Sequence, residues 1–271
     1  MSILENTPIL KTFMSRFGNL EFGDSPKNDL QAPARAGAKD EAFYLAEANQ
    51  LFESGHFEMA LRSFAKALEQ NPKSAPAWTG QVRMLIELGE FKEAKLWAEK
   101  ALAIFPREGE LLAAKAVALA RAGDGKGALA YSDASMEVEA GTPYIWLARG
   151  DVLLARKEKR AEYCFEKALL LARDHWLWPW LASRIHSFYH QTAQALKFAQ
   201  QALALDAVRA VVWLQLGRCE AALGLSHKAQ QSFARAKELD ADCPELETLT
   251  NELASESFLD RILRRFSLKT G

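Results

Sequence analysis

The sequence predicts an all-α protein built as a solenoid of repeated helix pairs. Small residues recur with a fixed period: six alanines follow one another at steps of 34, 34, 33, 34 and 34 residues, at Ala60, Ala94, Ala128, Ala161, Ala195 and Ala229. Seven residues after each comes a second small residue, at Ala67, Ala101, Ser135, Ala168, Ala202 and Ala236. A period near 34 in a helix-forming sequence is typical of helix-turn-helix units that stack on one another.

The composition is ordinary for a protein that forms a hydrophobic core. Of its 271 residues, 49% are hydrophobic and 25% are charged, and the formal net charge is −1. A nearly neutral chain has no global electrostatic reason to bind nucleic acid or an anionic membrane. We therefore expect a protein partner and no nucleic acid.

The cysteines and the ends of the chain favour a cytoplasmic protein. Cys164, Cys219 and Cys243 lie far apart without a CxxC pair, which argues against a disulfide framework and a thiolate zinc site. The sequence shows no secretory signal and no run of 18 apolar residues that could span a bilayer. No integral membrane segment is expected.

The first 39 residues differ from the rest of the chain. Residues 1–22 form an apolar segment in which Ile9 to Leu20 follow helical spacing, and Pro8 suits the first position of a helix. Residues 23–39 are rich in Gly, Ser, Pro, Asn and Ala and read as a flexible linker. The segment is either a docking peptide, which we favour, or an end of the chain without such a role. Self-association through it is a further option.

The repeats occupy residues 41–243. Their common pattern has an aromatic or apolar residue near position 4, small residues near positions 8, 20 and 27, in most repeats a glycine near 15, and often a proline near 32. Examples are Trp78, Leu85, Gly89, Ala94, Ala101 and Pro106, and Trp213, Gly217, Gly224, Ala229, Phe233 and Ala236. This pattern resembles the tetratricopeptide repeat family. The resemblance implies a right-handed superhelical solenoid of about six repeats that binds proteins and catalyses nothing.

Repeats four and five depart from the pattern. The fourth is one residue short, and the missing residue is expected in the turn at 156–159, where Lys157 stands in place of glycine. The fifth contains three tryptophans in five residues, Trp176, Trp178 and Trp180, which cannot all face one helix seam. At least one is expected to be exposed or to face the groove. Two interpretations are open: an anchor for a partner, or irregular core packing. Function is expected to concentrate in these two repeats.

Residues 244–271 are predicted to form a C-terminal capping helix and a basic tail, because a terminal repeat exposes an apolar face that needs a cover. The tail, with Arg261, Arg264, Arg265 and Lys269, is amphipathic. Membrane-surface binding is one interpretation, and packing of the tail against repeat six, with its cations at a helix C-terminus, is the favoured one.

Motifs for catalysis are missing from the sequence, so no enzyme, cofactor or metal site is expected. The glycine-rich run at 123–127 falls between two predicted helices without a preceding strand, which favours a turn over a phosphate loop. His186 and His190 have the i,i+4 spacing of metal ligands on one helix. The repeat register places His190 in a turn, and no third ligand is evident nearby.

The resemblance also implies where a partner binds, because helix positions 2, 5, 6, 9, 12 and 13 of such repeats face a concave groove. A carboxylate clamp is not expected, since Leu45 and Thr79 occupy slots where the clamp needs lysine. The groove instead suits an apolar or amphipathic segment. The predicted partner-binding residues are Asn49, Phe52, Arg83, Ile86, Arg121, Tyr144, Asp151, Trp176, Trp180 and Arg218.

Three functions fit these observations. The first is a scaffold or adaptor that holds a partner segment in the concave groove. The second is a cytoplasmic chaperone for a secretion, pilus or flagellar substrate. The third is a regulatory subunit of an enzyme or signalling complex, whose residues 1–39 contact the catalytic partner. RNA binding is disfavoured because the inner face lacks a repeated polar or basic position.

Overall fold

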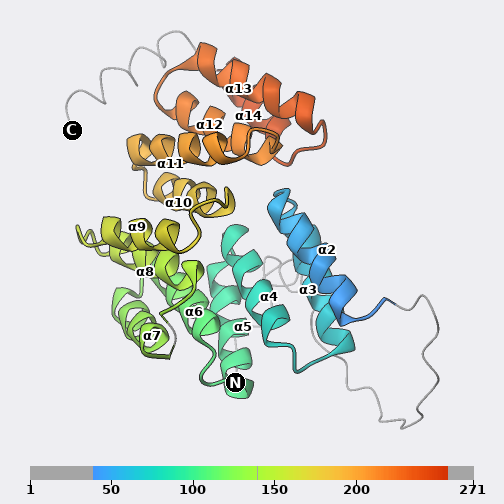
Figure 1. The fold of residues 1–271 in the computed structure, drawn as a ribbon, viewed down its shortest axis with the longest axis vertical. Coiled ribbons are helices and arrows are strands. Elements are labelled where there is room, and N and C mark those ends of the chain that lie inside the picture. Colours follow the sequence, from blue (N-terminus) through green and yellow to red (C-terminus); the bar gives the residue numbers. More distant parts are fainter. Residues whose placement is uncertain (1–38, 139, 256–271) are drawn as a thin grey trace, which may run out of the picture.

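The computed structural model describes residues 39–138 and 140–255, which form helices and no strands. Twelve helices make six antiparallel pairs, and a thirteenth follows them (Figure 1). The helices are α2 (Glu41–Glu53), α3 (Phe57–Gln70), α4 (Ala75–Glu87), α5 (Phe91–Ile104), α6 (Gly109–Arg121), α7 (Gly125–Val138), α8 (Pro143–Ala155), α9 (Ala161–Leu171), α10 (Leu177–Phe188), α11 (Thr192–Leu205), α12 (Ala210–Ala222), α13 (Ser226–Leu239) and α14 (Leu246–Ser255).

Side-chain caps start the first helix of several repeats. Asp40, Ser74 and Thr142 each accept a hydrogen bond from the backbone N–H three residues later, over 2.9, 3.4 and 3.3 Å. Such caps satisfy an amide that has no partner within the helix. Proline follows within the first turn of α4 and α8, where its missing N–H costs nothing.

The small residues of the sequence pattern form the seams of the solenoid, as predicted. All twelve are at most 1% exposed. Antiparallel helices approach closely only where side chains are small, and neighbouring aromatics fill the remaining space. At Gly150 the approach is closer still, because a Cβ there would lie 2.8 Å from Cζ of Phe165.

A residue with positive φ ends the first helix of each repeat. Four of the six are glycines, whereas the fourth and fifth turns use Lys157 at φ 58° and His190 at φ 57°. The prediction that Lys157 replaces a glycine is confirmed. The missing residue lies just after it: α9 begins only at Ala161 and has 11 residues, while the second helix of every other repeat has 14. The first turn of α9 is lost.

The joint between repeats four and five is the thinnest in the solenoid. The helices α9 and α10 touch less than any other second helix and the helix that follows it. The tryptophan-rich stretch lies at this joint, and Trp176 directly precedes α10 with helical dihedral angles. The irregular sequence of repeats four and five therefore corresponds to a local weakening of the stack.

The helix α14 covers the last repeat. It packs against α12 and α13, with Leu246 and Leu253 each 5% exposed. The predicted C-terminal cap is confirmed for this helix. The basic tail at 256–271, the apolar segment at 1–22 and linker residues 23–38 lie outside the described residues. In the part of the chain that is described, no helix has the length and apolar character needed to cross a membrane.

The superhelix closes on itself across its concave side. The turn between α2 and α3 meets α10 and the start of α12, although more than a hundred residues separate them (Figure 1). A Cβ added to Gly55 in that turn would lie 3.0 Å from Cγ1 of Val211. Repeat one thus packs against repeats five and six as well as against repeat two.

Candidate partner-binding site

A buried polar network occupies the middle of the concave side. Arg121 of α6 donates two hydrogen bonds to Oδ2 of Asp151 in α8, over 3.1 and 2.6 Å. The hydroxyl of Tyr189, just after α10, donates to Oδ1 of the same carboxylate over 2.6 Å. Burial, and then the charge of Asp151, raises the pKa of Tyr189 above its ordinary value. The network ties repeats three, four and five together.

A second ion pair joins repeats two and five. Arg184 of α10 contacts Oε2 of Glu87 in α4 through Nε at 2.9 Å and Nη2 at 2.7 Å. Burial alone would raise the pKa of Glu87, but the charges of Arg184, Arg121 and Arg83 outweigh it and hold this pKa below its ordinary value. The carboxylate is therefore ionised at neutral pH.

An aromatic cluster completes the closure. The ring of Trp180 lies 6.2 Å from that of Phe52 and 6.4 Å from that of Phe57, measured between centroids. Its indole N–H donates to the carbonyl oxygen of Val211 over 3.1 Å, and the guanidinium of Arg184 lies 4.7 Å from the Phe57 centroid. Trp180 is 1% exposed.

The predicted partner-binding residues separate into three groups. Ile86, Arg121, Tyr144 and Asp151 surround a cavity of about 30 Å³ at the centre of the concave side. Trp180 and Arg218 border a cavity of about 10 Å³ near α14, where Arg218 pairs with Glu245, and Trp176 packs on Trp180. Asn49, Phe52 and Arg83 line a cleft of about 300 Å³ near the N-terminal end of the array.

The first two groups are buried in the described structure. The sequence predicts an apolar groove with at least one exposed or groove-facing tryptophan, whereas Trp176 is 5% exposed and Trp180 1%, and Ile86, Tyr144 and Asp151 are also buried. The reason is that α10 folds across the groove and fills it with the protein's own aromatic and ion-paired side chains. Trp178 is half-buried and packs on the core. Irregular core packing is therefore the interpretation that these tryptophans support.

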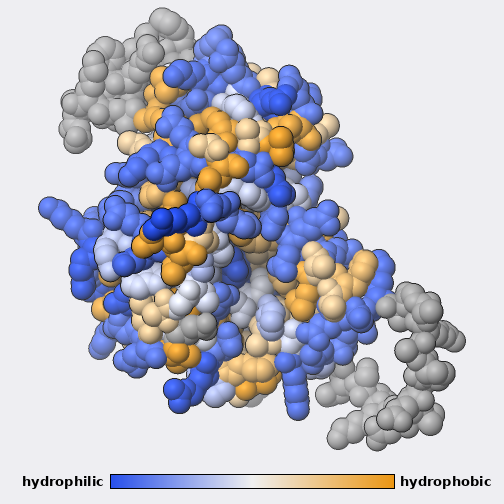
Figure 2. Space-filling view, viewed as in Figure 1, coloured by the Kyte–Doolittle hydropathy of each residue, from blue (hydrophilic) through white to orange (hydrophobic). Residues whose placement is uncertain are grey.

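The third group borders what we call the N-terminal cleft, between α2, α4 and the start of α6. Phe64 and Met84 form a buried floor, Asn49 is exposed, and Glu108 and Glu110 stand at the α6 side. The guanidinium of Arg83 lies over Tyr144, 4.0 Å from the ring centroid. On the face shown in Figure 2, hydrophobic residues lie in several groups that polar residues separate. One of these groups lies over α2 and α3.

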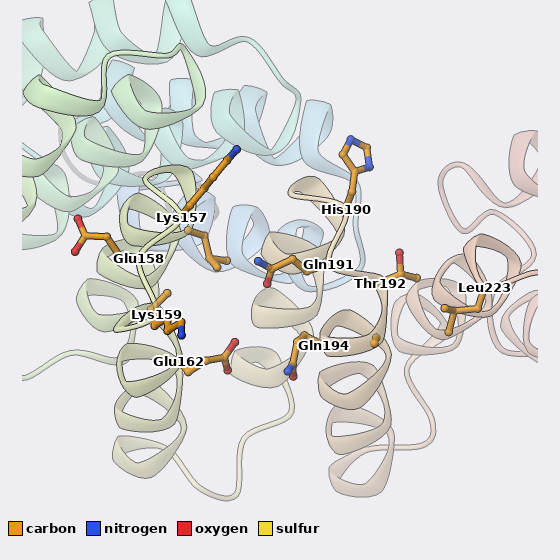
Figure 3. A pocket seen from close by; sticks show the side chains of 12 residues that line it. Lys157, Glu158, Lys159, Glu162, His190, Gln191, Thr192, Gln194 and Leu223 are labelled. Carbon is orange, nitrogen blue, oxygen red and sulfur yellow. The ribbon is translucent and has the colours of Figure 1, made fainter. Parts of the chain in front are cut away.

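A second cleft opens where α9 has lost its first turn, and we call it the notch. It has a volume of about 760 Å³ and lies between the α8–α9 and α10–α11 turns (Figure 3). Lys157 and Lys159 come from one turn, and Gln191 from the other points across the gap. The sequence analysis did not predict this cleft. The signals were the 33-residue step and the two turns that lack glycine.

The histidine pair is structural. His186 is 0% exposed and packs between two rings: Phe165 is tilted against it and Phe198 is stacked on it, with centroids 4.6 and 5.1 Å away. Its Nδ1 lies 2.8 Å from Oε1 of Gln191, and burial lowers its pKa. His190 lies in the turn, as predicted. Within residues 39–138 and 140–255, no three His, Cys, Asp or Glu side chains are grouped to hold a metal ion.

Models of the tetratricopeptide repeat match the chain in two places. One match covers residues 51–118, from the end of α2 through most of α6, and the other covers residues 210–243, which contain α12 and α13. The chain therefore contains tetratricopeptide repeats, at residues 51–118 and 210–243. The tetratricopeptide repeats with the irregular turns, four and five, lie outside both matches.

Solved structures show the same fold at low sequence identity. IFIT1, solved as a monomeric mutant with Gppp-AAAA, has a TM-score of 0.59 and 15% identity over 94% of this chain and 61% of that chain. A tetratricopeptide repeat protein from Parabacteroides merdae has a TM-score of 0.52 and 16% identity over 81% and 86%. Cut9–Hcn1 of the APC/C has a TM-score of 0.49 and 16% identity over 80% and 44%, which is too low to support the same fold. No curated protein sequence matches the chain.

The presence of tetratricopeptide repeats carries a general consequence for function. Tetratricopeptide repeats form scaffolds for protein–protein interaction and are generally not enzymes. This chain spans less than two thirds of the length of the matched chains of Cut9–Hcn1 and of IFIT1.

Proposed function

We propose that this protein is a non-catalytic scaffold that holds one segment of a partner protein in the N-terminal cleft. The observation that supports this site is its volume, which exceeds that of the other cavities on the concave side. The N-terminal cleft has a volume of about 300 Å³, whereas the central cavity has about 30 Å³ and the cavity near α14 about 10 Å³. A volume near 300 Å³ is at the lower end of the range for ligand-binding pockets, and it can hold a few side chains of a partner.

The lining of the cleft favours an amphipathic segment with at least one cation. Leu45 and Pro76 offer apolar surface above the buried Phe64, and Asn49 offers an exposed amide that can pair with a peptide backbone. Glu108 and Glu110 place two carboxylates on one side. The charge of Arg83 is offset in part by Glu87.

The alternative of a chaperone receives less support. A chaperone that shields a long apolar segment needs a continuous apolar groove. The aromatic residues that would line it are buried in the protein's own core. The alternative of a regulatory subunit rests on residues 1–39, nearly all of which lie outside the described residues.

The test uses a peptide library displayed against the full-length protein. Peptides selected by the wild type are measured for affinity to Asn49→Lys and to Gln194→Lys, which places the same charge in the notch. We expect selected peptides to be basic and apolar, and Asn49→Lys to weaken their binding at least tenfold while Gln194→Lys leaves it unchanged. Binding that resists Asn49→Lys, or that fails in Gln194→Lys instead, contradicts the proposed site.

A further inference from the structure

We propose that residues 9–20 of this chain dock into the N-terminal cleft of the same molecule and compete there with the partner segment. The inference deepens the proposed function, because it names a segment that the same cleft accepts. It rests on three observations: where the chain enters the described structure, the charge of the two surfaces, and the size of the cleft.

The first observation is the point of entry. The helix α2 starts at Glu41, and its residues Leu45, Asn49 and Phe52 form one wall of the cleft. At 1.5 Å per residue, α2 is about 20 Å long. The composition between Phe22 and Glu41 predicts a linker, and a chain of that length has an average end-to-end span of roughly 22–26 Å. The tether thus delivers residues 9–20 to the wall of the cleft, at an effective concentration on the order of millimolar.

The second observation is charge complementarity. Residues 9–20 contain two cations, Lys11 and Arg16, and no acidic residue. The cleft has Glu110 on its α6 side, next to Glu108, which already has an interaction within the protein, and the charge of Arg83 in the same lining is offset in part by Glu87. An ionic contact at the rim of a site adds little affinity but sets orientation and partner choice. The cleft therefore favours this segment over an acidic one.

The third observation is size. On a helix, residues four apart lie on the same face, as Phe13 and Phe17 do in the predicted helix. A cleft of about 300 Å³ with the buried ring of Phe64 on its floor can take one such aromatic pair. The much larger notch is lined by Leu154 and Leu223 together with charged and amide side chains, and it has no Phe, Tyr or Trp in its lining.

The experiment is cross-linking in the full-length protein with Met14→Cys. It is paired with Asn49→Cys in the cleft or, as a control, with Gln194→Cys in the notch. The native Cys164, Cys219 and Cys243 are at most 5% exposed and stay unreactive in the folded protein. We expect a short bifunctional thiol reagent to link positions 14 and 49 within one molecule at least tenfold faster than positions 14 and 194.

Charge reversal provides the second measurement. The double substitution Glu108→Lys with Glu110→Lys should slow the 14–49 link at least fivefold, and adding Lys11→Glu with Arg16→Glu should restore it. Equal rates at both cysteine pairs, a link formed between two molecules, or no response to charge reversal each overturn the proposal.

The two proposals fail differently. If the peptides selected above lose affinity in Asn49→Lys while the 14–49 link forms no faster than the 14–194 link, the cleft is a partner site that residues 9–20 do not occupy. If the 14–49 link forms as expected but no peptide responds to Asn49→Lys, the cleft serves the chain's own segment and the proposed scaffold site is wrong.

Discussion

Two kinds of joint hold this solenoid together, and they differ in where their stability comes from. Between regular repeats, such as two and three, neighbouring helices meet along continuous seams of small residues. Between repeats four and five, α9 is short and barely touches α10. There the stack is held by contacts distant in sequence, including Arg184 to Glu87 and Tyr189 to Asp151.

The difference shows how the concave groove of a repeat protein can become filled by the protein's own side chains. In an array where each repeat contacts only its neighbours, stability is a sum of local terms and the concave side stays open. Here α10 crosses to α2 and α4, so aromatic residues expected to contact a partner become core. The surface left for a partner is displaced to the N-terminal cleft and, as a second opening, to the notch.

The largest expected effect comes from removing the shared carboxylate at the irregular joint. Asp151→Ala leaves the buried Arg121 guanidinium without its partner, which should cost about 3–5 kcal/mol. The matched control is Asp133→Ala, which breaks an ion pair with Arg149 at a half-exposed carboxylate and should cost less than about 1 kcal/mol. Urea unfolding measures both, and equal losses would show that the network does not hold the joint.

The next effect concerns the pair between repeats two and five. Glu87→Gln removes a charge-assisted hydrogen bond to Arg184 and should cost about 1.5–3 kcal/mol at pH 7. Since the folded-state pKa of Glu87 is lowered, its contribution is fully present above its ordinary pKa of 4.5 and is lost as the pH falls through the folded value. The stability gap between wild type and Glu87→Gln should therefore close below pH 4.5. A gap that widens in acid is incompatible with the pair.

The third prediction compares overpacking at a regular seam with overpacking at the seam of repeat four. Ala94→Leu should overpack a regular seam and cost about 1–3 kcal/mol. Ala161→Leu should cost less, because Ala161 borders the notch and the larger side chain has space to enter. Thermal unfolding of the two variants tests the difference. If Ala161→Leu is as damaging as Ala94→Leu, the seam of repeat four is as tight as the others.

The smallest expected change in stability comes from substitutions at the positive-φ turn positions, where turns with glycine and turns without it should respond with opposite signs. Lys157→Gly relieves a left-handed backbone at a residue with a side chain and should stabilise the protein by about 1 kcal/mol. Gly89→Ala should destabilise it by a similar amount, since its φ is 79° while no atom lies within 4 Å of the added Cβ. Chemical denaturation under identical conditions checks the opposite signs. A loss in Lys157→Gly would mean that the lysine side chain contributes more than the strain costs.

Much of the fold follows from the sequence, because its determinants are local and periodic. The spacing of Ala60, Ala94 and their equivalents predicts the seams, and Lys157 in place of glycine marks the irregular turn. The closure could not be predicted in this way. Glu87 and Arg184 are 97 residues apart, and no local pattern reveals that α10 would cross the groove to reach α4. Repeat register places Trp180 correctly on the concave side but says nothing of what covers it.

The closure of the concave side is most directly tested by the distance between two spin labels, at Met59→Cys on α3 and at Val208→Cys before α12. Both positions are exposed, at 52% and 71%, and the native cysteines are buried. We expect one narrow distance distribution in the full-length protein, and a longer, broader one when Asp151→Ala is added. A broad distribution in the protein without Asp151→Ala would contradict the account, because repeat one would then not be held against repeats five and six.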